Sequence, residues 1–246
     1  MAKSDIFIPD HALILTAALT GAPEEEECRL GFVRPLLSTE QQDGLSRSRR
    51  AVDRALRFLV RALLLEGLNY FALDGPKLLR NLAWNDKGQP NLGNLKVSFS
   101  HSFPYGFCAI AKTPVGVDVE GWSRDLDPAD FGVVFGPREM EAIQAVVNPN
   151  SELIRRFTIK ESILKALGGG FLLNPFLVDS SEPRNSKCLG ALELNLGHLD
   201  LSPDFWFTWS ILSRSSSLSP SNSFVRFMEP FDRQSFRRQI NIFEFN

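Results

Sequence analysis

The 246-residue sequence has little that could form a disulfide framework, a zinc site or a membrane anchor. Its three cysteines, Cys28, Cys108 and Cys188, are far apart and form no CxxC pair, so neither disulfides nor zinc ligation is expected. Three histidines are too few to favour a three-histidine metal site. No run of 18 apolar residues occurs, which argues against a transmembrane helix. We therefore expect a cytoplasmic protein that does not enter membranes.

The sequence also lacks a strong charge of either sign. The formal net charge is −2, with 43% hydrophobic and 23% charged residues, which is ordinary for a globular protein. This balance gives no overall attraction to nucleic acid or to a membrane surface. The phosphate-binding patterns GxxxxGK[ST] and GxGxxG are absent, which argues against a standard nucleotide-binding fold. Any anion-binding site must therefore come from a local cluster of residues.

The hydrophobic pattern predicts an α+β protein. Its halves, residues 1–113 and 114–246, are compatible with two similar lobes. A long helix is expected at 46–66, because apolar residues recur there at helical spacing. Its arginines fit either a solvated face or a contact to phosphates or an acidic partner. We also expect helices at 136–147 and 152–167, and strands at 11–19, 95–100, 106–112, 115–120, 187–196, 204–212 and 222–228.

Two carboxylates interrupt the apolar strand at 115–120. Asp118 and Glu120 are two residues apart, so both side chains point to the same face of the sheet, about 7 Å apart along the chain. Two like charges in an apolar strand are costly unless a cation lies beside them. This strand therefore predicts a cation site.

A second motif lies on the predicted helix 152–167. Glu161 and Lys165 are four residues apart and share one helix face. Alone, this pair fits an ordinary surface ion pair. A third motif, residues 97–102 (VSFSHS), places His101 at the end of an apolar strand, and a single histidine there is most often structural.

Together, the three motifs predict chemistry at a phosphoanhydride. Asp118, Glu120 and Glu161 would supply three oxygen ligands of the kind that Mg²⁺ prefers. Lys165 and His101 would supply positive groups for phosphates. A divalent ion and a lysine beside two phosphates stabilise attack at phosphorus. Mn²⁺ accepts the same ligands, so the ligand type does not decide between the two metals.

The chain resembles the 4′-phosphopantetheinyl transferases of the Sfp type. That family has a Gly-(Ile/Val)-Asp-(Ile/Val)-Glu strand, which is similar to residues 116–120 here. About forty residues later it has a Trp-(Thr/Ser)-x-Lys-Glu-(Ala/Ser)-x-x-Lys helix, similar to residues 157–165. Upstream, a Ser-His-Ser strand resembles residues 97–102, and a Gly-Lys-Pro loop is partly matched by residues 88–90. The order and the spacing of all four motifs agree.

The resemblance implies two small, mostly antiparallel sheets with helices, and a ligand cleft between the lobes. It implies a monomeric enzyme that transfers the phosphopantetheine arm of coenzyme A to a serine of an acyl or peptidyl carrier protein, in fatty-acid, polyketide or nonribosomal peptide synthesis. Glu161 and Lys165 would be catalytic, and Asp118, Glu120 and Glu161 would hold Mg²⁺. The residues expected to contact coenzyme A are Ser100, His101, Lys160, Lys165, Arg50 and Arg54.

The chain departs from the family pattern at two positions. Gln89 replaces the lysine of the Gly-Lys-Pro loop, which removes a positive charge near the phosphates. Phe157 replaces the tryptophan and keeps an aromatic packing group. Two alternatives stay open from the sequence. One is a Mg²⁺-dependent phosphohydrolase, and the other is a relative that binds coenzyme A or a carrier without catalysis.

Overall fold

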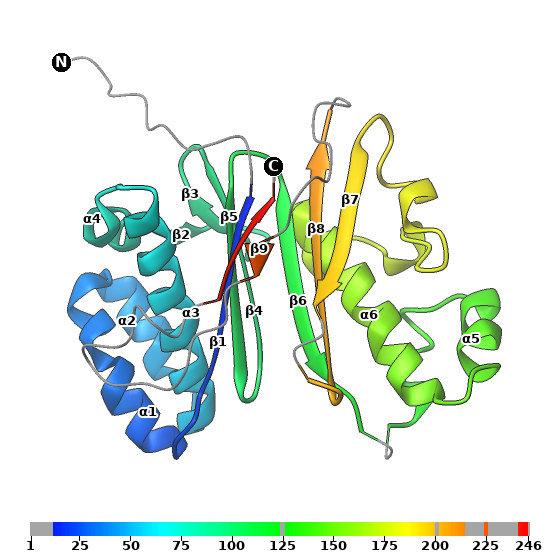
Figure 1. Ribbon diagram of the computed structural model, residues 1–246, viewed down its shortest axis with the longest axis horizontal. Coiled ribbons are helices and arrows are strands. Elements are labelled where there is room, and N and C mark those ends of the chain that lie inside the picture. The colour runs from blue at the N-terminus through cyan, green and yellow to red at the C-terminus, as the bar shows by residue number, and fades with distance from the viewer. Residues whose placement is uncertain (1–11, 124–125, 200–201, 215–223, 226–240, 246) are drawn as a thin grey trace. The chain divides into compact units, whose positions relative to one another are not determined.

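The computed structural model describes residues 12–123, 126–199, 202–214, 224–225 and 241–245. Within these residues the chain is an α+β protein with two antiparallel sheets, as the sequence predicted. It divides into two compact units, which are labelled by element in Figure 1. The first unit takes residues 1–84, 90–113 and 220–246, and the second takes 85–89 and 114–219. The predicted lobe boundary after residue 113 stays a prediction.

The first unit is built on a sheet with the strand order β2-β3-β4-β5-β1-β10-β9. Strand β1 is central, because it pairs antiparallel with β5 on one side and with β10 on the other. The last two described strands therefore join the first strand rather than the strands of residues 114–213. The strand bounds are β1 Ala12–Ala18, β2 Ala83–Trp84, β3 Pro90–Leu92, β4 Leu95–Ser102, β5 Tyr105–Ala111, β9 Phe224–Val225 and β10 Asn241–Phe245.

Helix α3 packs on this sheet and supplies much of the core of the first unit. It runs from Ala51 to Tyr70, later than predicted. The preceding residues are not helical, because Arg54 Nη1 bonds the carbonyls of Ser48 and Arg49, each at 2.9 Å. The other helices of the unit are α1 Pro23–Leu30, the 3₁₀ helix Gly31–Leu36, α2 Thr39–Ser46 and α4 Gly75–Arg80.

The second unit has a sheet with the order β6-β8-β7 and the long helix α6 packed against it. Its strands are β6 Val115–Gly121, β7 Glu193–Leu199 and β8 Phe205–Ser213. Helices α5 and α6 span Pro137–Gln144 and Pro149–Ala166. Short 3₁₀ helices lie at Pro128–Phe131, Gly170–Leu172, Pro175–Leu177 and Pro183–Asn185.

Three sequence predictions need correction or lie outside the described chain. Residues 187–192 are not part of a strand, because Leu189 and Leu192 form turns with backbone bonds to Ser186 and Leu189. Helix α6 begins at Pro149 rather than 152, because the Asn148 side chain caps it. Of the predicted strand at 222–228, the structure describes only the two residues of β9, and the rest lies outside the described residues.

Gly116 on β6 allows helix α6 to lie directly against the strand. A Cβ atom at this position would lie 1.8 Å from the backbone oxygen of Ser162 and 2.7 Å from the backbone nitrogen of Ala166. Both obstacles are helix backbone, which cannot move aside as a flexible side chain can. The helix and the strand are therefore held at a spacing that only glycine permits.

We expect Gly116→Ala to lower the free energy of unfolding by about 3 kcal/mol, the upper end of the usual cost of overpacking. Urea denaturation followed by circular dichroism measures the loss. The matched control is Gly44→Ala in α2, where a Cβ atom meets nothing within 4 Å. That variant should be neutral or slightly more stable, because alanine favours a helix. Equal stabilities for the two variants would contradict the close packing of α6 on β6.

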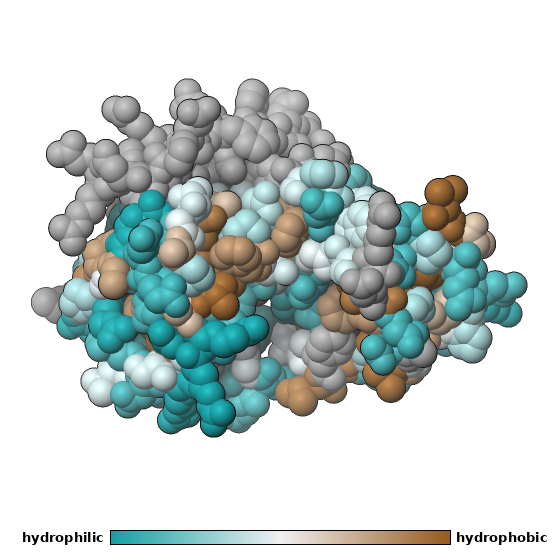
Figure 2. Space-filling view, turned by 90° about the horizontal axis from the view of Figure 1, so that it is seen from below, coloured by the Kyte–Doolittle hydropathy of each residue, from teal (hydrophilic) through white to brown (hydrophobic). Residues whose placement is uncertain are grey.

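No described helix combines the length and the apolar character that a membrane crossing needs. Several large apolar side chains are nevertheless exposed, among them Val147, Val133 and Leu172. On the face shown in Figure 2, the hydrophobic side chains form several separate groups with hydrophilic residues between them. Scattered exposure of this kind is normal for a protein surface.

Candidate functional site

The second unit places both carboxylates of β6 on the strand face that carries helix α6. Gly116 lies against α6, as described above. Because side chains alternate along a strand, Asp118 and Glu120 point to the same face as Gly116. Asp118 is only 1% exposed, and Glu120 is half-buried. The strand therefore presents two acidic side chains to the helix.

A lysine of α6 is the cation beside these carboxylates. Lys165 Nζ donates to Asp118 Oδ1 at 2.6 Å and to the Val117 carbonyl at 3.3 Å. Burial lowers the pKa of Lys165, but the charges of Asp118 and Glu161 and the hydrogen bond to Asp118 outweigh it and raise the pKa overall. Lys165 is therefore held in its charged form, and it partly offsets the cost of burying Asp118.

The negative charge of Glu161 is compensated less by Lys165 than that of Asp118. It is 7% exposed, and its Oε2 atom lies 3.7 Å from Lys165 Nζ. Its Oε1 atom is buried without a hydrogen-bond partner among the described residues. Burial raises the pKa of Glu161 to about 7, the charge of Asp118 adds to this rise, and the charge of Lys165 opposes it. The site can therefore hold a proton, or accept a second cation, at Glu161.

The donor chemistry of this group fits a hard divalent cation. Oxygens of Asp118 and Glu161 both approach Lys165 Nζ, so they lie no more than about 6 Å apart. The buried, unbonded oxygen of Glu161 is the kind of atom that a metal would satisfy. Within the described part of the chain, no three His, Cys, Asp or Glu side chains are gathered closely enough to hold an ion. Ligation of Mg²⁺ by Asp118, Glu120 and Glu161 therefore stays a prediction.

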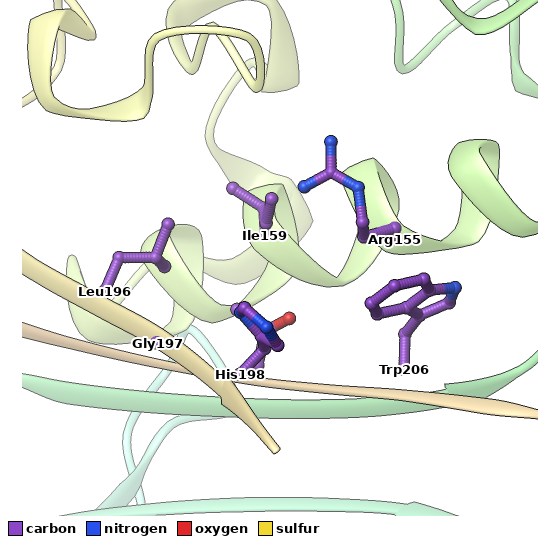
Figure 3. A pocket seen from close by; sticks show the side chains of 7 residues that line it. Arg155, Ile159, Leu196, Gly197, His198 and Trp206 are labelled. Atoms are coloured by element: carbon purple, nitrogen blue, oxygen red, sulfur yellow. The ribbon is translucent and has the colours of Figure 1, made fainter. Parts of the chain in front are cut away.

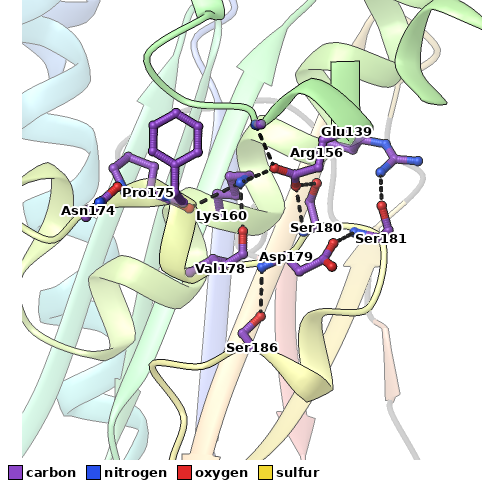
Figure 4. Close-up of polar contacts among 12 residues, drawn as sticks. Glu139, Arg156, Lys160, Asn174, Pro175, Val178, Asp179, Ser180, Ser181 and Ser186 are labelled. Carbon is purple, nitrogen blue, oxygen red and sulfur yellow. Dashed lines mark hydrogen bonds and ion pairs between the residues drawn. The ribbon is translucent and has the colours of Figure 1, made fainter. Parts of the chain in front are cut away.

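Lys160, which was expected to contact coenzyme A, is instead used inside the second unit. It is 0% exposed. Its Nζ atom donates to Glu139 Oε2 at 2.8 Å and to the carbonyls of Pro175 and Val178 at 3.1 and 2.7 Å (Figure 4). All three N–H donors of an ammonium are thereby occupied. A contact of Lys160 with coenzyme A would require one of these bonds to open, and it stays a prediction.

Glu139 completes this network and was not singled out from the sequence. Its Oε1 atom accepts from the backbone nitrogen and the hydroxyl of Ser180 at 2.9 and 2.5 Å, and its Oε2 atom also accepts from Gly136 N at 3.2 Å. Burial raises the pKa of Glu139, but the hydrogen bonds from Lys160 and Ser180 lower it overall, so the carboxylate stays ionised. Arg156 adds a hydrogen bond to Ser181. Lys160 and Arg156 of α6 thus fix helix α5 and the loop 174–181.

Lys160 and Glu139 are 21 residues apart in the sequence, so no local sequence pattern could reveal the pair.

The remaining predicted contacts of coenzyme A lie in the first unit. Ser100 and His101 are on β4, where Ser100 is buried and His101 is half-buried. Arg50 forms a two-point ion pair with Asp53, and its side chain is 76% exposed. The pKa of Asp53 is lowered, mainly by the hydrogen bond from Arg50, with smaller contributions that include the charge of His101. Arg50 and Asp53 therefore form a local ion pair at the start of α3.

Arg54 is more firmly engaged than Arg50. Its Nε and Nη2 atoms bind Glu27 at 2.9 Å, and its Nη1 atom bonds two carbonyls before α3, as described above. Contact of Arg54 with coenzyme A would require these bonds to open. The contacts of Ser100, His101, Arg50 and Arg54 with coenzyme A stay predictions.

Gln89 packs against the C-terminal end of α6. Its Nε2 atom donates to the backbone oxygen of Lys165 at 3.3 Å. Gly168, whose φ of +80° lies in the left-handed region, is so close that a Cβ atom there would be 2.8 Å from Gln89 Oε1. The glutamine therefore supports the helix turn that carries Lys165, which the sequence motif alone did not indicate.

Comparisons with known proteins point to one family. Residues 114–207 match the family model of the 4′-phosphopantetheinyl transferase superfamily. The chain is also 29% identical over 156 residues to the 4′-phosphopantetheinyl transferase gsp of Aneurinibacillus migulanus. This alignment covers 61% of the chain and 65% of that relative, so the chain spans less than two thirds of the relative's length. Both findings confirm the resemblance to the 4′-phosphopantetheinyl transferases that the sequence motifs indicated, and the Sfp type stays a prediction.

Proposed function

We propose, from this confirmed resemblance to the 4′-phosphopantetheinyl transferase superfamily, that the chain transfers the phosphopantetheine arm of coenzyme A to a serine of an apo carrier protein. The serine oxygen forms a bond to the β-phosphorus, and the bond from this phosphorus to the bridging oxygen breaks. The leaving group is adenosine 3′,5′-bisphosphate. The carrier would be an acyl or a peptidyl carrier.

The observation that supports this reaction most directly is the group formed by Asp118, Glu161 and Lys165. It lies inside the segment that matches the family model. Lys165 Nζ is within 2.6 Å of one carboxylate and 3.7 Å of the other. A half-buried lysine beside two carboxylates suits a substrate that brings both a metal ion and a pyrophosphate.

The side chains of this group would divide metal binding, phosphate binding and proton transfer among them. Asp118, Glu120 and Glu161 would hold Mg²⁺, or Mn²⁺ in its place, which would neutralise negative charge on the pyrophosphate. Lys165 would move its hydrogen bond from Asp118 Oδ1 to a phosphate oxygen. Glu161 would accept the proton of the attacking serine, directly or through a water molecule.

The test is the intact mass of an apo acyl carrier protein after incubation with this protein, Mg²⁺ and coenzyme A. We expect a gain of one phosphopantetheine group, which EDTA and Glu161→Ala should both abolish. Several unrelated acyl and peptidyl carriers should be compared, because the sequence does not identify the pathway.

The other outcomes separate the alternatives. Coenzyme A that is consumed while every carrier keeps its mass would favour a Mg²⁺-dependent phosphohydrolase. Coenzyme A that stays intact, with no modified carrier, would favour a binding protein without catalysis. Either result would contradict the proposed transfer.

A further inference from the structure

Arg61 of helix α3 is a buried cation that no described carboxylate compensates. It is 8% exposed, and its Nη1 atom donates to the Arg57 carbonyl at 2.8 Å. Its Nε atom is buried without a hydrogen-bond partner, and Nη2 makes no hydrogen bond within the described residues. Burial, together with repulsion by the charge of Arg57, lowers the pKa of Arg61 to about 10, so the guanidinium stays charged at neutral pH. The folded protein therefore buries a positive charge that lacks an opposite charge, which is costly.

The unused edge of this guanidinium is the edge that binds anions at two points. Nε and Nη2 lie side by side there and match two oxygens of one carboxylate or phosphate. Arg50 uses the same edge to bind Asp53, at 2.9 and 2.8 Å. Arg155, which lines the cavity between α6, β7 and β8 in Figure 3, uses it to bind Glu152 at 2.6 and 2.7 Å. The corresponding edge of Arg61 fits an anion that is not part of the described chain.

Arg57 adds a second cation one helical turn away. It lies four residues before Arg61, so the two arginines are neighbours on one face of α3. Arg57 is half-buried, and its hydrogen bond to the Gly44 carbonyl is long, at 3.4 Å. Two positive charges that repel each other are stabilised when an anion binds beside both of them.

Trp84 of β2 supplies an aromatic surface next to Arg61. The central carbon of the Arg61 guanidinium lies over the Trp84 ring, 5.2 Å from its centroid. The ring attracts the cation but brings no negative charge. Trp84 is 40% exposed, so part of the indole can be reached from the solvent. Because aromatic side chains stack well on nucleotide bases, an anion that carries a flat base could contact both residues.

We propose that Arg61, Arg57 and Trp84 form a site in the first unit for a nucleotide, with its phosphate monoester on the arginines and its base on the indole. A phosphate monoester carries about two negative charges at neutral pH, which suits two arginines better than a carboxylate does. Coenzyme A is one source of this chemistry, because its adenosine carries a 3′-phosphate, and a free nucleotide is the other. Only the first source rests on the proposed function.

Isothermal titration calorimetry with adenosine 3′,5′-bisphosphate, in EDTA and without a carrier protein, tests the site. We expect the wild type to bind, and Arg61→Met to raise Kd by at least about tenfold. Arg61→Lys keeps the charge but loses the two-point edge, and it should raise Kd about fivefold. Trp84→Leu removes the stacking ring and should raise Kd about tenfold. The control Lys77→Met removes an exposed positive charge from α4 of the same unit and should leave Kd within about twofold.

Coenzyme A and dephospho-coenzyme A distinguish the two sources. If coenzyme A is the occupant, it should bind at least about tenfold more tightly than dephospho-coenzyme A, which lacks the 3′-phosphate, and Arg61→Met should remove this difference. If a free nucleotide is the occupant, the two coenzymes should bind alike, while binding of adenosine 3′,5′-bisphosphate still depends on Arg61.

Two results would overturn the site. One is a wild-type protein that binds none of these compounds. The other is a Kd close to the wild-type value for both Arg61→Met and Trp84→Leu. Arg61→Met should fold normally, because it removes a buried charge without a counter-charge, and circular dichroism checks this. Transfer to a carrier is measured separately, so a protein that binds the nucleotide through Arg61 but transfers nothing contradicts only the proposed function.

Discussion

Replacing Lys160 with methionine should lower the free energy of unfolding by about 3–5 kcal/mol, because Glu139 would be left as a buried charge without its cation. Lys160 is fully buried, and its three hydrogen bonds join α6 to α5 and to the loop 174–181. Urea denaturation at neutral pH measures the loss. The lowered pKa of Glu139 gives this carboxylate a stability contribution that is present above the ordinary pKa of 4.5 and is lost as the pH falls through the lowered value. Burial lowers the pKa of Lys160 despite the opposing hydrogen bond and charge of Glu139, so burying the ammonium offsets part of this contribution.

The double variant Glu139→Gln/Lys160→Met is the informative control. Glutamine keeps an oxygen that can accept from Ser180 and removes the charge, so the double variant should recover a substantial part of the loss. The interaction energy from the double-mutant cycle separates this coupling from ordinary packing changes. A double variant that is less stable than Lys160→Met alone would contradict the assignment of the pair as a structural clamp.

Replacing Glu161 with glutamine should stabilise the metal-free protein at pH 8 while it abolishes transfer. Burial raises the pKa of Glu161 from 4.5 to about 7. Between these two pH values the folded protein keeps a proton on Glu161 that the unfolded chain has already released. Its stability therefore falls as the pH rises from about 4.5 to about 7, and the full cost remains above that range. A shift of this size corresponds to about 3 kcal/mol in the free energy of unfolding. Glu161→Gln should restore this free energy at pH 8 and should leave the stability at pH 4.5 nearly unchanged.

The measurement is urea denaturation at both pH values with EDTA present. Glu141→Gln removes a carboxylate at an exposed position of α5 and serves as the matched control. Adding Mg²⁺ at pH 8 should then stabilise the wild type more than Glu161→Gln, because only the wild type keeps the full set of carboxylates. An equal effect of Glu161→Gln at both pH values would show that burial does not hold a proton on this residue. A gain of stability with a loss of activity is a common relation at functional sites.

The elements that the sequence predicted well are those with a strong local signal. The strand that carries Asp118 and the helix that carries Glu161 and Lys165 were both expected, and the structure brings Asp118 and Glu161 to the same ammonium group. Their alternation and their four-residue spacing depend only on the local backbone geometry. The family resemblance then supplied the expectation that the strand and the helix act together.

The features that the sequence did not predict depend on partners that are distant in the chain. Lys160 follows the family motif, yet its bonds to Glu139, Pro175 and Val178 make it part of the structure of the unit. The late start of α3 follows from the bonds of Arg54 to the preceding carbonyls, which compete with helix formation. Neither arrangement has a periodic signal, so neither could be found before the tertiary contacts were known.

The position of β1 has a consequence for the order in which the protein folds during synthesis. β1 pairs with β5, residues Tyr105–Ala111, and with β10, residues Asn241–Phe245. The larger part of the second unit, residues 114–219, is translated between these two partners. One edge of β1 therefore stays without its neighbour until residues 241–245 have been translated, while the three strands of the second unit can already pair. A pause in translation between β5 and β10 would prolong the exposure of that edge, and unpaired strand edges tend to associate with other chains.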